Sequence, residues 1–334
     1  MTRIKTGKLD ANASSSDGEY PFFTCSKEPL KIATYSYDCE CVLVAGNGDL
    51  NVKYYNGKFD AYQRTYIIEG NDDGKLYIPY LYFFMEKYVE ELRKLSIGGV
   101  IKYIKLGNLT DAMIELPDME KQKFIVRLLS KLKGIITQRR QQLQKLDELV
   151  KARFVELFGD PLKNEKCLPV VSGEALFKLS NGKALPNNKR FDTGVPAYGG
   201  NGISWYTDEI LCDYDTIIVG RVGFQSGNVH LVKAPLWVTD NAMYISNINS
   251  RECDIRYLCA LMEHIDFTRY QDAGDLKKIT QKPFMQMHYL MPPLPLQKQY
   301  IAFVEQVDKS KVAVQKALDE AQLLFDSLMQ KYFG

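Results

Sequence analysis

The chain has 334 residues, of which 46% are apolar and 25% charged, a balance typical of a globular protein with about two domains. No apolar stretch is long enough to cross a bilayer, and the N-terminal residues lack the apolar core of a signal peptide, so we expect a cytoplasmic protein. The net charge of +2 neither requires nor excludes a nucleic-acid partner, and a basic surface for such a partner must be local.

Cysteine and histidine usage argues against a metal site. The chain contains seven cysteines and three histidines, and no two cysteines form a CxxC pair. An odd number of cysteines without such pairs is typical of reduced thiols in a cytoplasmic protein. We therefore expect no bound metal.

Residues 1–117 are predicted to form a domain of mixed strands and short helices. The apolar run Cys41–Val44 is followed by Gly46-Asn47-Gly48, which predicts a strand that ends in a turn. Leu76–Glu91 favours a short helix. Polar turn clusters fill much of the rest, and the paired carboxylates Asp72 and Asp73 are interpreted as part of a solvated turn. Binding residues usually lie on such loops.

Residues 118–159 are predicted to form one long helix. No proline interrupts it, and its apolar residues recur in alternating steps of four and three, the seam of a left-handed coiled coil. Arg139 and Arg153 interrupt this series. Pro117 precedes the helix, and Gly159 with Pro161 ends it. The seam residues are Ile125, Leu129, Leu132, Ile136, Leu143, Leu146, Val150 and Leu157.

The second half of the chain repeats this arrangement. Residues 160–291 are predicted to form a second domain, in which the run Thr216–Val219 again precedes a glycine turn, Gly220–Gly223. Residues 292–334 are predicted to form a second long helix, interrupted in its seam at Lys311. The seam residues of this helix are Val304, Val307, Val314, Leu318, Phe325 and Leu328.

An apolar stripe on a helix of about 40 residues, roughly 60 Å long, cannot remain exposed to water. Because a globular domain separates the two helices along the chain, we expect them to pair antiparallel, with the two domains related by an approximate twofold axis. The alternative is that each helix packs on its own domain.

A shift of 175 positions places the chain on itself. Gly7-Lys8 falls on Gly182-Lys183, and Gln122-Lys123 falls on Gln297-Lys298. In the middle of the units the offset drifts to 177, where Tyr80 matches Tyr257. The sequence thus predicts two copies of one unit with loops of unequal length. Two similar modules with different loops suit a protein that reads a long ligand in two unequal halves.

No catalytic constellation survives inspection. Gly46-x-Gly48 lacks the third glycine and the well-placed acidic residue of a dinucleotide loop, so a structural turn is the favoured interpretation. Met291-Pro292-Pro293-Leu294 lacks the polar residue that precedes the prolines in an amino-methyltransferase loop. The three histidines have no obvious Ser or Cys partner. The chain is therefore predicted to bind a ligand, without a cofactor of its own, and not to be an enzyme.

The starts of the two long helices resemble a known family. Leu116–Lys123 and Met291–Lys298 are similar to the "PPLPEQ" entry to the conserved helices of type I restriction–modification specificity subunits. Gly7-Lys8 and Ser180–Lys183 resemble the early turn of that family. Val219–Gly223 and Trp237–Ala242 resemble the loop and strand in the middle of its target recognition domains. The resemblance extends over nearly the whole chain.

The resemblance implies an α+β fold in which two loop-rich α/β target recognition domains, residues 1–117 and 160–291, are separated by an antiparallel two-helix coiled coil, residues 118–159 and 292–334. Each domain would read one half of a bipartite DNA sequence. Two modification subunits, which carry S-adenosylmethionine and act on adenine, would dock along the helices, and restriction subunits would join them for cleavage. The first domain has no counterpart of Asp160–Ala175, which leaves open whether its first strand is missing or supplied by another chain.

Direct reading of bases needs Arg, Lys, Asn and Gln side chains on loops that enter the major groove. For each such residue, a solvated surface group is the alternative, and a phosphate contact would position the domain without specifying a base. A non-catalytic coiled-coil scaffold and a specificity module of another restriction-type enzyme are the alternative functions. The candidate DNA-binding residues are Lys8, Asn12, Asn47, Lys53, Lys58, Arg64, Lys183, Asn187, Asn188, Lys189, Arg190, Asn201, Arg221, Gln225, Lys277 and Lys278.

Overall fold

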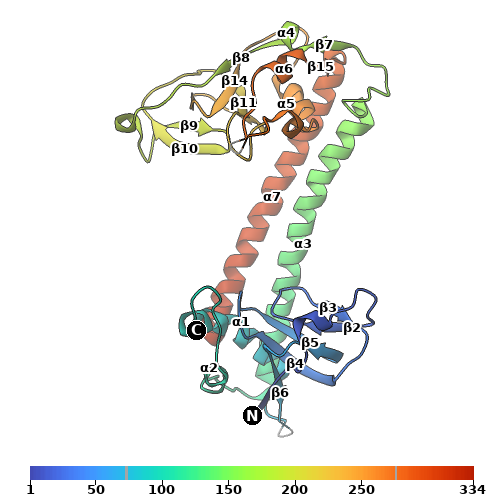
Figure 1. Cartoon of the computed structure of the whole chain (residues 1–334), viewed down its shortest axis with the longest axis vertical. Helices are drawn as coiled ribbons and strands as arrows, with labels where there is room; N and C mark the ends of the chain where they lie inside the picture. The colour runs from blue at the N-terminus through green and yellow to red at the C-terminus, as the bar shows by residue number, and fades with distance from the viewer. Residues whose placement is uncertain (72–73, 275–276) are drawn as a thin grey trace. The chain divides into compact units, whose positions relative to one another are not determined.

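The computed structural model describes residues 1–71, 74–274 and 277–334 (Figure 1), so the predicted turn at Asp72 and Asp73 lies outside the described residues. The chain divides into two compact units. Unit 1 is Met1–Gln141 with Val314–Gly334, and unit 2 is Gln142–Ala313. Each unit therefore contains one half of each long helix. In the described part of the chain, no helix is both long and apolar enough to cross a membrane.

Unit 1 is built on one six-stranded sheet in the order β1-β6-β4-β5-β2-β3. Strand β4 pairs antiparallel with β5 and β6, and β2 pairs parallel with β5. Alternate residues of β4 face opposite sides, as the period of a strand requires. Val42 and Val44 pack with α1, whereas Cys41 and Leu43 pack with Phe59 on the other face. The elements are β1 (Thr2–Thr6), η1 (Ala11–Ala13), β2 (Tyr20–Phe23), β3 (Leu30–Ile32), β4 (Tyr37–Ala45), β5 (Val52–Ala61), β6 (Thr65–Gly70), α1 (Ile78–Leu95) and α2 (Leu106–Thr110).

Unit 2 divides its strands among three sheets, with the orders β12-β11-β14-β8, β10-β9-β13 and β15-β7. The four-stranded sheet is the counterpart of strands β1, β6, β4 and β5 of the unit 1 sheet. The elements are β7 (Val170–Ser172), α4 (Gly173–Leu176), β8 (Phe177–Asn181), η2 (Asn187–Lys189), β9 (Val195–Gly199), β10 (Gly202–Thr207), β11 (Thr216–Gly220), β12 (Val229–Val232), β13 (Trp237–Val238), β14 (Ala242–Ile248), α5 (Ile255–Glu263), η3 (Phe267–Tyr270), α6 (Lys282–Gln286) and β15 (His288–Leu290).

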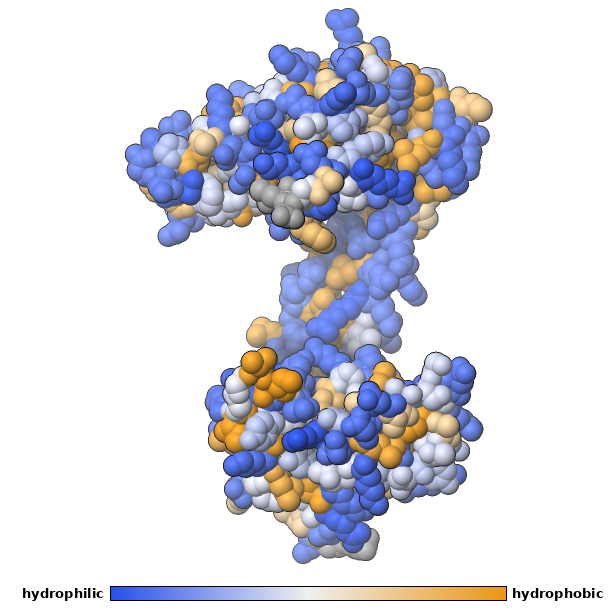
Figure 2. Space-filling view, viewed as in Figure 1, coloured by the Kyte–Doolittle hydropathy of each residue, from blue (hydrophilic) through white to orange (hydrophobic). Residues whose placement is uncertain are grey.

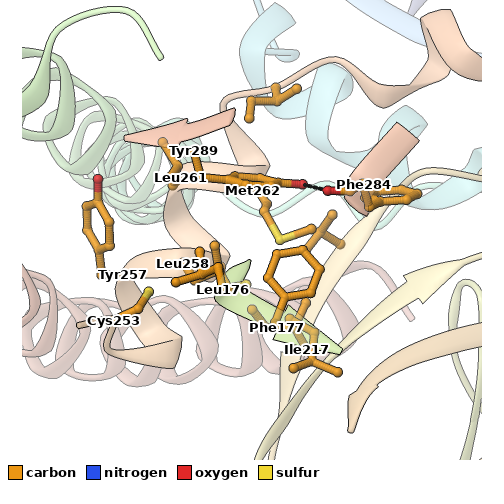
Figure 3. Close-up of a cluster of buried hydrophobic side chains, with 14 of the residues drawn as sticks. Leu176, Phe177, Ile217, Cys253, Tyr257, Leu258, Leu261, Met262, Phe284 and Tyr289 are labelled. Atoms are coloured by element: carbon orange, nitrogen blue, oxygen red, sulfur yellow. Dashed lines mark hydrogen bonds between the residues drawn. The ribbon is translucent and has the colours of Figure 1, made fainter. Parts of the chain in front are cut away.

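The core of unit 2 lies between the four-stranded sheet, α5, and the segment α6–β15 that precedes the second long helix. Figure 3 shows Leu176 and Phe177 in this core together with Tyr257, Phe284 and Tyr289, all of them buried. The Tyr289 hydroxyl donates a hydrogen bond of 3.0 Å to the Phe284 carbonyl, which satisfies its polar group away from water. The short segment β7–α4 thus supplies part of the core, through Leu176.

The two predicted long helices are α3 (Met119–Phe158) and α7 (Leu294–Phe333), each of 40 residues. Within each unit they run side by side (Figure 1). In unit 1, Ile125 and Leu129 of α3 cluster with Met329 of α7, and the Arg140 guanidinium donates to Gln322 at 3.2 Å. The start of α3 therefore lies beside the end of α7, and residue numbers fall along α7 as they rise along α3. The antiparallel pairing predicted from the two seams is confirmed in this unit.

The same direction holds in unit 2. Phe154 of α3 packs against Tyr300 of α7, and Lys311 forms a 2.6 Å ion pair with Asp147. The predicted interruptions of the seams have partners here, since Lys311 is neutralised by Asp147 and the Arg153 guanidinium lies 5.6 Å from the Phe303 ring centre. The side of the long helices that is visible in Figure 2 is mostly hydrophilic.

The structure buries or half-buries the seam residues named above. Packing on the globular parts accompanies the pairing of the helices, so the two interpretations weighed for the sequence are not exclusive. In unit 1, Tyr80 and Phe83 of α1 join the α3–α7 cluster. In unit 2, Tyr300 and Ile301, near the start of α7, join the core of the domain that precedes this helix, and Phe154 and Phe158, at the end of α3, complete that core. The buried or half-buried seam residues are Ile125, Leu129, Leu132, Ile136, Leu143, Leu146, Val150, Leu157, Val304, Val307, Val314, Leu318, Phe325 and Leu328.

A buried glutamine joins each long helix to its domain. The Gln122 side chain is fully buried; it accepts from the Tyr77 amide at 2.9 Å and donates to the Lys75 and Pro117 carbonyls, both at 2.8 Å. Three backbone groups that no helix or strand satisfies are thus paired by one side chain.

Gln297 repeats this arrangement in unit 2. It is also fully buried, accepts from the Asp254 amide at 2.9 Å, and donates to the Glu252 and Pro292 carbonyls at 2.8 Å. The glutamine of the motif at the start of each long helix therefore has one structural role in both units. The predicted two-copy architecture is confirmed at the level of individual hydrogen bonds.

A second matched pair lies at the start of each sheet. Gly7 follows β1 and Gly182 follows β8. A side chain at Gly7 would collide with the Ala61 and Tyr62 carbonyls, and one at Gly182 with the Val238 and Thr239 carbonyls. Only glycine allows this close approach of two backbone segments, which explains why the residue recurs at the offset of 175.

Candidate nucleic-acid interface

The loops that follow the central strand of each unit are held by the same backbone hydrogen bonds. We call these two loops, Gly46–Asn51 between β4 and β5 and Arg221–Asn228 between β11 and β12, the braced hairpins. In unit 1, the Gly46 amide donates to Arg64 at 2.8 Å, the Gly48 amide to Lys102 at 2.9 Å, and the Ile104 amide to Gly46 at 2.9 Å. The Gly46–Gly48 turn is therefore a structural element.

The braced hairpin of unit 2 repeats these bonds. The Arg221 amide donates to Asn241 at 2.9 Å, the Gly223 amide to Lys277 at 2.8 Å, and the Ile279 amide to Arg221 at 3.0 Å. Each unit thus brings three chain segments together. Backbone hydrogen bonds fix the positions of these segments, so their side chains can differ between the units. Such a rigid frame with variable side chains is what sequence reading requires.

Unit 2 gathers five of the predicted DNA-binding residues at its braced hairpin. The β9–β10 turn approaches so closely that a Cβ atom on Gly200 would lie 2.9 Å from the Gly220 Cα. Val222 forms a backbone bridge with Lys278, and the Arg221 guanidinium lies 3.4 Å from the Asp240 carbonyl. The residues brought together on these segments are Asn201, Arg221, Gln225, Lys277 and Lys278.

The other predicted residues of unit 2 lie on the segment between β8 and β9. Lys183 accepts a 3.0 Å hydrogen bond from the Trp237 indole through its carbonyl. Lys189 forms ion pairs of 3.4 Å with Asp208 and Glu209, which raise the pKa of the exposed ammonium through hydrogen bonding. The side chains of Asn187 and Asn188 are exposed.

Arg190 has partners within the domain. Its guanidinium donates twice to the Leu185 carbonyl, at 2.9 and 2.7 Å, and its centre lies 4.0 Å from the ring centre of Trp205. An arginine held in this way orders its own loop. A base contact by Arg190 would require these interactions to be exchanged for new ones.

In unit 1 the braced hairpin brings together Asn47 and Arg64, because the Arg64 carbonyl accepts from the residue before Asn47. The Lys53 ammonium bonds to Asn51, and burial lowers the pKa of this lysine. Lys58 lies on β5 with its ammonium 4.6 Å from the Tyr35 ring centre.

Two predicted residues of unit 1 lie before its second strand. Lys8 is exposed after β1, and the Asn12 amide donates to the Asp10 carboxylate at 3.2 Å in η1. Neither takes part in the hydrogen bonds that brace the hairpin.

Sequence reasoning missed two residues of this frame. Lys102, whose carbonyl braces the unit 1 hairpin, is the counterpart of Lys277 at the offset of 175, so the repeat itself could have identified it. Phe224, at the tip of the unit 2 hairpin, is 92% exposed. Its signal is an aromatic residue inside a glycine turn, where no core position is expected.

The whole chain is similar to proteins of one kind. The family model described as the type I restriction modification DNA specificity domain matches residues 1–147 and 170–321. A relative from Escherichia coli, the type I restriction enzyme EcoDI specificity subunit, is 27% identical over 388 aligned residues, which cover 100% of this chain and 86% of the relative.

Solved structures agree in fold. The type I restriction–modification S subunit from M. genitalium matches with a TM-score of 0.71 at 17% identity, covering 100% of this chain and 94% of that one. A chain from a structure that describes complex assembly and conformational transition of the type I R-M system matches with a TM-score of 0.54 at 13% identity, covering 99% and 97% of the two chains.

Proposed function

Since this chain belongs to the family of type I restriction–modification DNA specificity domains, which makes it a non-catalytic specificity subunit for DNA target recognition, we propose that its two units read the two halves of one bipartite DNA sequence. The observation that carries the proposal is the pair of braced hairpins. Their three bracing backbone hydrogen bonds match, while the polar side chains on and beside them differ: Asn47 and Arg64 in unit 1, Arg221 and Gln225 in unit 2. Equal frames with unequal donors would read unequal half-sites.

The domain assignment follows from this proposal. Residues 1–117 and 160–291 would be the two target recognition domains, and residues 118–159 and 292–334 the helices on which two modification subunits dock. S-adenosylmethionine would bind to those subunits, which methylate adenine, and restriction subunits would join them to cleave DNA. The relation to the EcoDI specificity subunit, a component of a restriction enzyme, supports a role within such a complex.

A domain exchange tests the bipartite target. Residues 160–291 are replaced by the corresponding segment of a relative with a different target, and methylated adenines are mapped across the genome of cells that carry the modification subunit. We expect one half-site to change and the other to stay. The matched exchange of residues 1–117 should change the other half. A change in both halves, or in neither, would contradict the proposal.

The division of labour has its own test. The purified chain is incubated with target DNA and radiolabelled S-adenosylmethionine, with and without the modification subunit. We expect label in the DNA only when that subunit is present. Transfer by this chain alone would show that it carries a catalytic site.

A further inference from the structure

The tip of the unit 2 hairpin exposes a side chain that folding leaves unused. Phe224 is 92% exposed, whereas a buried phenylalanine is among the largest contributors to a protein core. On the hairpin, the polar Gln225 is exposed next to it, and Arg221 and the apolar Val222 are half-buried. Among hairpin residues 221–228, Phe224 is thus the one exposed large apolar side chain, whereas a docking surface for a protein partner is a contiguous apolar patch.

The backbone that carries this ring is held in place. Within the hairpin, the Ser226 amide donates to Gly223 at 3.0 Å and the Gly227 amide donates to Gly220 at 2.8 Å. Gln271, from outside the hairpin, donates to the Ser226 carbonyl at 2.7 Å. Gly223 and Gly227 adopt φ values of 92° and 97°, which side chains disfavour. The exposure of Phe224 is thus a consequence of an ordered turn.

The matched hairpin of unit 1 exposes a carboxylate at its tip and buries its apolar residue. Asp49 stands at the position of Phe224 at the offset of 175 and lies within 3.6 Å of Arg93 and 3.8 Å of Lys27. Leu50, the next residue, is buried, and its carbonyl accepts from Arg93 at 3.1 Å. Two hairpins with the same braces therefore end differently, and only that of unit 2 presents an apolar ring to solvent.

We propose that Phe224 inserts between two adjacent base pairs of the half-site that unit 2 reads. Apolar side chains on DNA-binding loops act as such wedges, because a ring can stack on bases that it separates. Arg221 and Gln225, on the same hairpin, supply hydrogen-bond donors suited to base edges or phosphates beside the opened step. This role rests on the proposed function. It predicts that two adjacent base pairs are unstacked in the half-site of unit 2 and not in that of unit 1.

The first test measures DNA binding by the full chain assembled with its modification subunits. Phe224→Ala is compared with Phe224→Trp, which keeps a stacking ring, and with Leu162→Ala, another exposed apolar residue of unit 2. We expect Phe224→Ala to weaken binding to the target about 5- to 150-fold, the range that loss of one base–aromatic stack gives. Phe224→Trp and Leu162→Ala should bind within about twofold of the unchanged protein.

The second test detects the opened step directly. 2-Aminopurine, whose fluorescence rises on unstacking, is placed in turn at each position of the half-site read by unit 2. The unchanged protein and Phe224→Trp should raise the fluorescence at one step, and Phe224→Ala should not. Melting temperatures of the variants should be equal, because Phe224 is almost fully exposed.

The outcomes separate two failures. If the unchanged assembly does not distinguish target DNA from a shuffled duplex, the proposed function is wrong. If it does, and Phe224→Ala binds and unstacks the DNA like the unchanged protein, the wedge is wrong. Loss of subunit assembly in Phe224→Ala, with unstacking retained, would also overturn the wedge and assign the ring to a protein contact.

Discussion

Units 1 and 2 share the same braced sheet, but they differ in the segment that packs beside its first strand. Strands β1 and β8 correspond at the offset of 175, yet in unit 2 the segment β7–α4 precedes β8, pairs with β15 and buries Leu176. In unit 1, no strand among the described residues pairs with Met113–Glu115, the counterpart of β15, and Met113 is 89% exposed. A cavity of about 490 Å³ lies there, lined by Met1, Ile4, Leu81, Phe84, Met113 and Ile114 among others.

The second difference lies in the inserted strands. Unit 1 adds β2 and β3 to the edge of its main sheet, whereas unit 2 builds β9, β10 and β13 into a separate sheet. The groups that both units keep are backbone amides and carbonyls bonded to one another or to a buried glutamine. The two units therefore share these main-chain hydrogen bonds, and they differ in the segments that the bonds do not hold.

The largest effect is expected at the buried glutamines, and it should be equal in both units. Gln297→Leu would remove the hydrogen bonds to the Asp254 amide and to two carbonyls, and Gln122→Leu would remove those to the Tyr77 amide and to the Lys75 and Pro117 carbonyls. Because buried groups that lose a hydrogen bond are costly, we expect each change to lower the free energy of unfolding by about 3 kcal/mol.

Urea unfolding followed by circular dichroism measures this loss, and hydrogen exchange identifies the unit that opens. Gln299→Leu, at an exposed position of the same helix, is the control and should change the free energy of unfolding by less than about 0.5 kcal/mol. A large loss in one unit with little in the other would show that the two glutamines are not equivalent.

Adding a copy of the β7–α4 segment to unit 1 tests this difference between the units. A copy of residues 160–176 is fused in place of Met1, since Leu176 corresponds to Met1 at the offset of 175. We expect the copied leucine to enter the cavity and stabilise unit 1 by about 2 kcal/mol, the contribution of one buried leucine. Hydrogen exchange in β1 and β6 should slow. The same fusion with Leu176→Asp in the added copy is the control, and equal behaviour of the two fusions would refute the idea.

The smallest effect concerns a cap present in one unit only. Asp254 accepts from the Arg256 amide at 3.0 Å and from its guanidinium at 2.8 Å, and these hydrogen bonds hold the pKa of the carboxyl below its ordinary value. Its counterpart Tyr77 makes no side-chain cap. We expect Asp254→Ala to lower the free energy of unfolding by about 1 kcal/mol at neutral pH.

The pH dependence of this loss has a definite sign. A carboxyl whose pKa is lower in the folded state stabilises above its unfolded pKa, and the contribution disappears as pH falls through the folded pKa. The difference between Asp254→Ala and the unchanged protein should therefore vanish in strong acid. Urea unfolding at about pH 7 and about pH 2.5 measures the free energy of unfolding of both proteins. If their difference is the same at the two pH values, the effect comes from the backbone and not from the carboxylate.

Several features of this protein are determined by the sequence alone. The seam of α3 and α7 follows from apolar residues at local spacings of three and four, and the repeat follows from identities such as Gln122 with Gln297. Both signals are carried by residue type and spacing, so they can be read without knowing which distant segments meet. The antiparallel pairing also followed, because only the order of helix and domain along the chain entered that argument.

Other features were decided by tertiary structure, because their partners are distant in sequence. Arg190 and Lys189 looked as free as Arg221, until folding placed Trp205 beside the first and Asp208 beside the second. Phe224 resembled any aromatic residue until the braces from Lys277 and Asn241 fixed its turn outward. Which side chains a loop presents depends on the backbone groups that hold it, and no local pattern specifies those groups.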